Sequence, residues 1–540
     1  MAEADSTSHG VSHMSKVPLA VLMLAQLCTS SDNCLVGIAS QSIIDTLGAT
    51  VADVQMATMA YSLVAGAFMI AGGMLGVRFG WRRTIRCGIA LAVLGEITLA
   101  LSPNMFVFTW CGRVLVGLGA SLITPSVLGL VPAYYQGRDR LVAFGFIAGA
   151  AAFATLAPIP FGVLLDSVGL RASFLVLVVM FAVVFAGTFL LPDAGGADAS
   201  RRLDVAGVGL AALGLFLLLT GASRVSTWGV VAPLDACPFT VFGISPALPM
   251  VACGIVVLAL LIRYEAGVER RHGSAVLPSA FIKTPGVRAG LLAVCVPYLY
   301  MGAQSIVMTP YIQLVGGLTA TQTGMLSLLS GVPMLVFSMF IPKLLPQASP
   351  RTVVRVGYSL LVVAACVLAL SLEEHGVSPL LFVAVALSGT GMGVVNSQAN
   401  YAVASAVGER YAEQSGGIQG TARNIGTAMG TAVVGSVMLV SIGLLFAASA
   451  SESSVGVGIA AAGTHTFMSD KGFEATLEPY DLDEGQTAYL LEANATSRRD
   501  AARASMLFSA ALFACCLVTT RNITDGPAAS SRANAPSAEG

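Results

Sequence analysis

The stretch VPLAVLMLAQLCTSSDNCLVGIASQSIIDTL, residues 17–47, is apolar along most of its length and carries five polar residues, Thr29 to Asn33, at its middle. A run of about 20 apolar residues crosses a bilayer as a helix, because a helix satisfies its own backbone hydrogen bonds there. The stretch therefore predicts a membrane-spanning helix with Asp32 near the midplane. An ionised carboxylate at that depth costs about 2.5–3.5 kcal/mol on insertion scales.

Two interpretations of Asp32 follow from this cost. The carboxylate faces a water-reached cavity or a partner charge and titrates as part of the protein's work, or it is neutral, bonds to Ser30 or Ser31, and only packs. We favour the first interpretation, since ionisable residues inside a membrane usually serve a function.

The composition of the whole chain agrees with a membrane protein. Of its 540 residues 56% are hydrophobic and only 11% are charged, and the mean hydropathy is +0.81. Soluble domains carry about 25% charged residues. The sequence has no Cys/His cluster with metal-ligand spacing, and no glycine-rich loop follows a predicted strand. We therefore expect no enzyme activity, no cofactor and no nucleic-acid partner.

Fourteen segments are apolar enough to be membrane spans, and the even number places both termini on the same side. Most of the Lys and Arg residues fall in segments on the side of the termini. The positive-inside rule then predicts a multi-pass protein of the cell membrane with cytoplasmic N and C termini. The predicted spans lie near residues 17–44, 54–76, 84–102, 107–131, 141–165, 172–191, 204–222, 246–264, 286–314, 322–346, 352–372, 377–405, 414–447 and 503–520.

The spans divide the chain into six parts. A cytoplasmic tail (1–16) precedes a six-helix bundle (17–191), two inserted helices (192–264), a cytoplasmic interfacial loop (265–285), a second six-helix bundle (286–520) and a disordered tail (521–540). The second bundle includes a polar, acidic loop at residues 448–504, which we expect outside the cell and partly ordered at best.

Five local motifs carry a resemblance to a known family. The motifs are GMLGVRFGWRR at 73–83, RVLVGLGA at 113–120, APIPFG at 157–162, RLDVAG at 202–207 and GGIQGTARNIG at 416–426. They resemble five patterns of the major facilitator superfamily. The first three resemble its cytoplasmic loop signature, its fourth-helix R-x-x-x-G-x-G-A signature and its antiporter G-P-x-x-G-G pattern. The last two resemble its seventh-helix and thirteenth-helix patterns. The set resembles the fourteen-helix drug:proton antiporter-2 family within it.

The resemblance implies an all-α membrane fold of two six-helix bundles with two helices inserted between them. It implies a proton-coupled antiporter that exports lipophilic or amphipathic molecules such as drugs by alternating access, with Asp32 and Arg113 coupling the protons. The residues that it places in gating motifs are Gly73, Gly76, Arg78, Gly80, Arg82, Arg83, Gly117, Pro158 and Gly162. Pro158 lacks a backbone donor, so a kink is expected in the fifth span.

Several positions depart from the family patterns. Val77 stands where the loop signature has Asp, Trp81 where it has a basic residue, and Ala157 and Phe161 where the antiporters have glycine. Gating and coupling are therefore expected to differ in detail. Two alternatives stay open: export of a lipid or an endogenous metabolite on the same fold, and a membrane scaffold or sensor that does not transport.

Neutral polar and aromatic residues in the second half predict a cavity for a lipophilic small molecule, held by apolar contact and a few hydrogen bonds. The predicted cavity residues are Asn33, Tyr298, Tyr300, Gln304, Tyr311, Asn396 and Asn400. Hydrogen bonding between helices is the alternative role for them. Glu96, a further buried charge, is expected to be protonated or to have a local partner. We expect a monomer whose partners are the cargo, protons and membrane lipid.

Overall fold

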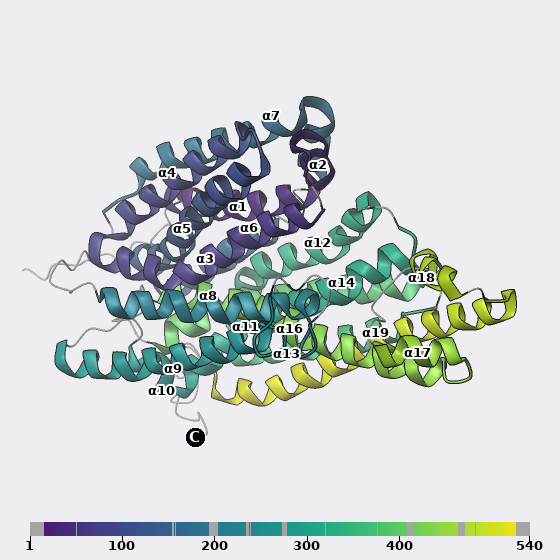
Figure 1. Ribbon diagram of the computed structural model, residues 1–540. Helices are drawn as coiled ribbons and strands as arrows, with labels where there is room; N and C mark the ends of the chain where they lie inside the picture. The colour runs from purple at the N-terminus through teal and green to yellow at the C-terminus, as the bar shows by residue number, and fades with distance from the viewer. Residues whose placement is uncertain are drawn as a thin grey trace, which may run out of the picture.

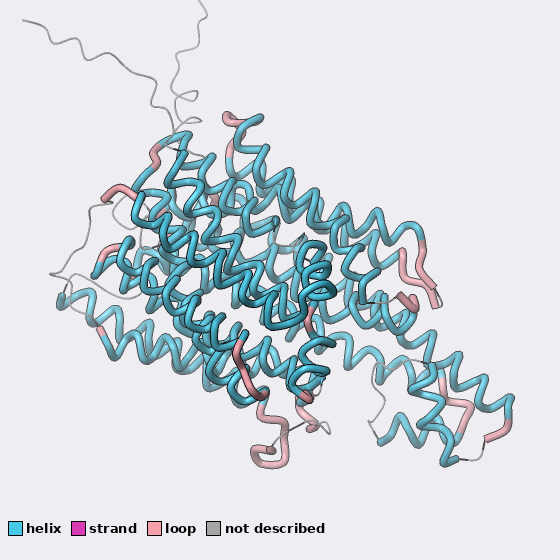
Figure 2. Tube along the Cα trace, turned by 90° about the horizontal axis from the view of Figure 1, so that it is seen from above, coloured by secondary structure: helices cyan, strands magenta, loops and turns pink. Residues whose placement is uncertain are grey.

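Helices make up almost all of the regular structure in the described part of the chain, which a computed structural model shows in Figure 1. The structure describes residues 16–49, 51–153, 156, 158–193, 204–233, 237, 239–272, 278–318, 320–374, 376–407, 415–462, 470–480 and 482–524. Within these ranges the β pairing is a single bridge between Val241 and Ile244. Seen from above, the helices run roughly side by side, as expected of a membrane protein (Figure 2).

The N-terminal half is the purple to blue part of Figure 1. Its helices pack as one unit, in which α3 and α4 both lie against α5 and α7 lies against α1 and α4. The elements are α1 (Lys16–Ile38), α2 (Ser40–Leu47), α3 (Val51–Phe79), α4 (Trp81–Ala100), the π-helix η1 (Val107–Arg113), α5 (Val114–Tyr134), α6 (Gly137–Phe153) and α7 (Pro158–Gly187).

The C-terminal half repeats this plan with six long helices. In it α11 lies against α16, α13 against α14, and α19 against both α13 and α16. The elements are α11 (Pro285–Pro310), the π-helix η4 (Tyr311–Val315), α12 (Ala320–Leu344), α13 (Pro350–Leu370), α14 (Pro379–Ala406), α16 (Ser415–Ser449) and α19 (Glu484–Thr519).

The two inserted helices, α8 (Val205–Trp228) and α9 (Ala247–His272), pack against each other, and α8 covers the line along which the halves meet. Leu215 and Leu219 of α8 share an apolar cluster with Ile70 of α3 and Ala428 of α16. Burial of these side chains ties the inserted pair to both halves. A short helix, α10 (Ser279–Lys283), lies between α9 and α11 within the stretch predicted as an interfacial loop.

Eleven of the described helical segments are long and apolar enough to cross a membrane. Three more complete the fourteen predicted spans. These are α1, whose middle carries the polar residues around Asp32, α4, which carries three arginines and Glu96, and α6, which is only 17 residues long. These three helices are shorter or more polar than the other eleven, but they belong to the same fold.

The division between the fifth and sixth predicted spans lies within α7. Helix α6 is described to Phe153 and α7 from Pro158, and residues 154, 155 and 157 lie outside the described part of the chain, so the kink at Pro158 stays a prediction. Helix α7 then bends at Gly169, whose φ of 80° and ψ of 178° are not helical. Proline is well suited to the first turn of a helix, where its missing N–H has no helical partner.

The expectation that residues 448–504 are at best partly ordered was wrong for most of that stretch. The structure places there α17 (Ser454–Ala462), α18 (Asp470–Leu477) and the first six turns of α19, which project together at one end of the C-terminal half (Figure 1). Phe446 and Phe473 pack edge to face at 5.5 Å in a small apolar core. Arg498 adds an ion pair to Asp470 at 2.7 Å.

The two halves touch closely at the end where α3 and α12 finish and α6 and α16 begin, which we call the closed end. A Cβ placed on Gly73 of α3 would lie 3.1 Å from the Cα of Gly417 in α16. A Cβ on Gly145 of α6 would lie 2.9 Å from the carbonyl oxygen of Ser338 in α12. Because glycine has no side chain, the backbones of the two halves can approach each other closely at these points.

Candidate functional site

A buried ion pair joins two helices of the N-terminal half. Arg113 Nη1 donates a hydrogen bond to Asp32 Oδ1 at 2.6 Å, and both side chains are 0% exposed. Asp32 lies in α1, and Arg113 is the last residue of η1, the π-helix that leads into α5. Single π-helical turns often occur at functional sites. The structure thus brings together the two residues predicted to couple protons.

Helix α3 provides further contacts to the guanidinium of Arg113. Arg113 stacks over the ring of Tyr61 at 4.6 Å, and its Nε donates to the carbonyl oxygen of Ala57 at 3.4 Å. Gly117, one turn after Arg113, lets α3 approach, since a Cβ there would lie 2.9 Å from the carbonyl oxygen of Tyr61. Charge, stacking and a backbone acceptor together hold Arg113 in one position.

The carboxylate of Asp32 was expected to face a water-reached cavity or a partner charge. In this conformation it faces the partner charge, because Arg113 seals it from the surroundings. The alternative partners were Ser30 and Ser31; Ser30 accepts from Gln26 at 3.2 Å, and Asp32 Oδ1 accepts from Arg113. An isolated buried charge is very costly, so an opposite charge at 2.6 Å is the physical reason that the pair can be sealed.

Glu96 of α4 lies at the same place. Its side chain is 0% exposed and comes within hydrogen-bonding reach of Asp32. That its neighbour would be Asp32 could not be predicted from the sequence, because the two residues belong to helices that are far apart in the chain. The local partner expected for Glu96 is therefore the Asp32–Arg113 pair.

The loop motif between α3 and α4 has an apolar centre. The ring of Trp81 is 2% exposed and packs so closely on Gly76 that a Cβ there would overlap it. Gly80, between the helices, has a φ of 89°, which favours glycine. Arg82 forms an ion pair with Asp193. Trp81, a departure from the family pattern, thus replaces a charge network by packing at this turn.

The remaining basic residues of this motif point outward or stack locally. Arg83 is exposed, and Arg78 lies over the ring of Phe79 at 5.6 Å. Neither contact reaches the Asp32–Arg113 pair.

Replacing Trp81 by Ala is expected to lower the free energy of unfolding by about 3–5 kcal/mol, because a large buried ring would leave a cavity against Gly76. Thermal unfolding of the detergent-solubilised protein measures the effect. Trp110→Ala is the matched control, since Trp110 is 52% exposed. Equal, small effects of the two substitutions would show that Trp81 does not hold the turn together.

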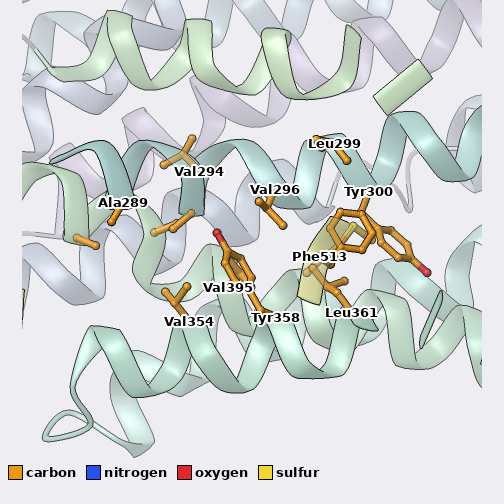
Figure 3. Packing of buried hydrophobic residues seen from close by; sticks show 14 of the residues in the cluster. Ala289, Val294, Val296, Leu299, Tyr300, Val354, Tyr358, Leu361, Val395 and Phe513 are labelled. Carbon is orange, nitrogen blue, oxygen red and sulfur yellow. The ribbon is translucent and has the colours of Figure 1, made fainter. Parts of the chain in front are cut away.

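Two of the predicted cavity residues lie in the apolar interior of the C-terminal half instead. Tyr300 is 2% exposed, and its ring lies 5.4 Å from that of Phe513 in α19 (Figure 3). Tyr311 is 0% exposed; its hydroxyl donates to the carbonyl oxygen of Glu373 at 2.8 Å and accepts from the backbone N–H of Glu373 at 2.6 Å. Tyr311 thus ties η4 to the turn after α13.

Two other predicted cavity residues, Tyr298 and Asn400, contact an arginine that lies within the predicted span 414–447. Arg423 of α16 is only 9% exposed. It donates to Asn400 Oδ1 of α14 at 3.0 Å and stacks over Tyr298 of α11 at 5.5 Å. Asn396, one turn from Asn400, is 6% exposed, and Gln304 of α11 is partly exposed. The sequence signal for Arg423 was its place within a span.

The side chains of Asn33 and Pro158 lie outside the described residues. A Cβ on Gly162 would have no heavy atom within 4 Å, so no close approach depends on it.

Comparison with known proteins agrees with these observations. Residues 22–431 match the family model described as Major Facilitator Superfamily. The chain is 30% identical over 438 residues to the tetracenomycin C resistance and export protein of Streptomyces glaucescens, covering 80% of this chain and 76% of that one. It is 27% identical over 432 residues to the puromycin resistance protein pur8 of Streptomyces alboniger, covering 78% and 81%.

A solved structure is similar in fold. The human organic anion transporter MFSD10 (TETRAN) aligns with a TM-score of 0.56 at 14% identity, over 94% of this chain and 98% of that one. The predicted fold class, fourteen helices in two halves with an inserted pair, is confirmed. The chain is a multi-pass membrane transporter and not an enzyme, and it belongs to the major facilitator superfamily.

Proposed function

We propose that this protein exports lipophilic or amphipathic small molecules, drugs among them, from the cell in exchange for protons. The relatives named for antibiotic resistance support the export of such compounds. We place the protein in the cell membrane as a monomer with both termini in the cytoplasm, as the distribution of Lys and Arg favours. Inward proton movement is worth about 2.3 kcal/mol per charge for each 100 mV of membrane potential.

The observation that carries the proton coupling is the sealed ion pair of Asp32 and Arg113. A change in the protonation of the acid that faces Arg113 would alter the strongest contact between α1 and η1. Loading and release of a proton would thereby change the packing inside the N-terminal half. Such a change can shift the equilibrium between conformations in which the two halves are tilted differently. The proton acts as a ligand, and a ligand favours the conformation that binds it more tightly.

The closed end lies on the proposed cytoplasmic side. The first turns of two helices there are basic, with Arg82 and Arg83 in α4 and Arg138 and Arg140 in α6, and basic residues at the ends of spans favour the cytoplasmic side. Lys343 of α12 stacks across the halves over Phe146 of α6 at 4.2 Å. We therefore assign this conformation to the stage of the cycle in which the cytoplasmic entrance is shut.

We place cargo recognition in the C-terminal half, on the group formed by Tyr298, Gln304, Asn396, Asn400 and Arg423. Their amide and guanidinium groups and an aromatic ring offer a few directed contacts among apolar walls. Tyr300 and Tyr311 are excluded from this group, because both hold the interior of their own half together.

The test uses purified protein in liposomes loaded with puromycin or tetracenomycin C. A pH gradient that drives protons opposite to the cargo is expected to accelerate cargo movement, and an ionophore that collapses the gradient should remove the acceleration. Equal movement of both compounds with and without the gradient would overturn proton-coupled export of these compounds.

Export of a compound made by the cell itself is a second candidate. The relative from Streptomyces glaucescens is named for both resistance and export. Deleting the gene and comparing small molecules inside and outside the cells separates the two: accumulation of a cell-made compound inside favours this candidate.

A further inference from the structure

Glu96 is a fully buried acid that the proposed ion pair does not use. It lies in α4 and is 0% exposed, and both of its carboxyl oxygens lack a hydrogen-bond donor among the described residues. Oδ2 of Asp32 is likewise without a donor. Buried acceptors without donors are rare in folded proteins and call for an explanation.

The two acids belong to one buried cluster. Asp32 pairs with Arg113 at 2.6 Å, and next to Glu96 and Arg113 the helices touch, since a Cβ on Gly95 would lie 3.1 Å from the carbonyl oxygen of Gly112, so the two carboxyl groups interact. Ionised carboxylates only accept hydrogen bonds, so two of them in contact repel. One proton between them turns the same contact into an O–H···O hydrogen bond. A single proton shared by Asp32 and Glu96 therefore pairs two of the three oxygens that lack donors.

The charges of the site lead to the same result. It holds one guanidinium, on Arg113, and two carboxyl groups, all with no exposure. Two ionised carboxyls would leave one negative charge uncompensated in the interior, at a high desolvation cost. One proton makes the cluster neutral. In other proteins, too, two buried carboxyl groups in contact share one proton, because they cannot both be ionised at low cost.

The groups facing Glu96 are few. Helix α1 provides Asp32 and Cys28, and η1 provides Arg113, which in turn stacks on Tyr61 of α3. Helix α5 has no Asp, Glu, Lys or Arg in its 21 residues. On α7, which also packs against α4, Arg171 is exposed to the surroundings. Arg113 is thus the cation that acts on both acids.

We propose that Glu96 is a second proton-binding residue of the transporter, which holds one proton jointly with Asp32 in the sealed state. This inference rests on the proposed proton coupling and makes it more specific. Arg113 keeps one of the two carboxyls ionised, and the other carries the transported proton. On opening, the O–H bond breaks and the proton passes to water; on reloading, water returns a proton to the pair.

The experiment compares the wild type with Glu96→Gln, Glu96→Asp and, as a matched control, Glu265→Gln, which alters a buried acid of α9. Infrared difference spectra between high and low pH are expected to show the carbonyl band of a protonated carboxylic acid in the wild type and in E265Q. The band should be lost in E96Q and return in E96D. Liposomes containing E96Q should move puromycin down its own gradient and lose acceleration by a pH gradient.

The outcomes separate this inference from the proposed function. If E96Q keeps both the band and the pH-driven acceleration while Asp32→Asn loses the acceleration, Glu96 has only a structural role and the inference is overturned. If the wild type itself shows no pH-driven acceleration, the proposed function fails first. If E96Q does not fold, E96D still decides, because a carboxyl at that position should preserve the band and the acceleration.

Discussion

Replacing Asp32 by Asn is expected to abolish export driven by a pH gradient, reducing it to the rate of liposomes without protein. Asparagine keeps the shape of the side chain but cannot bind and release a proton. Transport of puromycin with and without the gradient measures the loss. Glu492→Gln, on the exposed face of α19, is the control that removes an acid without touching the site.

The same substitution should also destabilise the fold, because it leaves Arg113 buried beside a neutral group. Breaking one side of a buried ion pair costs about 3–5 kcal/mol of unfolding free energy. A double variant, Asp32→Asn with Arg113→Gln, should recover much of that stability and none of the gradient-driven export. Recovery of both would show that Asp32 serves only to pair with Arg113.

Replacing Gly417 by Leu is expected to open the closed end. A Cβ at this position would lie 2.9 Å from the carbonyl oxygen of Met69 and 3.1 Å from the Cα of Gly73. Overpacking of this kind costs about 1–3 kcal/mol, and it acts only in the conformation in which α3 meets α16. The population of the closed conformation should therefore fall about tenfold, since 1.4 kcal/mol corresponds to that factor.

Maleimide labelling of a cysteine introduced at Met69, which is 5% exposed, reports on this opening in a background without the native cysteines. Labelling should be faster in Gly417→Leu than in the parent. Gly443→Leu lies on the same helix, where a Cβ would have no heavy atom within 4 Å, and should leave the rate unchanged. Equal labelling in all three proteins would contradict the assignment of this end as a gate.

The arrangement of helices could be predicted because hydropathy is a property of each segment alone. Helix α1 was found although polar residues interrupt it, since about 20 apolar residues surround Asp32. Arg113 was connected with Asp32 only through the family resemblance. The break at Gly169 lies between the predicted spans 141–165 and 172–191, whereas the kink at Pro158 stays a prediction, because residues 154, 155 and 157 lie outside the described part of the chain.

Side-chain neighbours on different helices could not be predicted, since they depend on the rotation of each helix. Tyr300 and Tyr311 follow a helical spacing that suits a cavity wall, yet both face the interior of the C-terminal half. Glu96 meets Asp32 for the same reason: packing of α4 against η1 and α3 brings it there. Helices α17 and α18 and the first six turns of α19 were missed because their apolar core is small, with Phe446 and Phe473 at its centre.

The most direct test of the buried acid as the proton carrier is the pH inside liposomes while cargo leaves. Liposomes loaded with puromycin and a trapped pH-sensitive dye are diluted into puromycin-free buffer of the same pH. The lumen is expected to acidify with the wild type, as protons enter in exchange for cargo, and to stay constant with Asp32→Asn. Equal acidification with both proteins, or puromycin efflux from wild-type liposomes at constant internal pH, would contradict the mechanism.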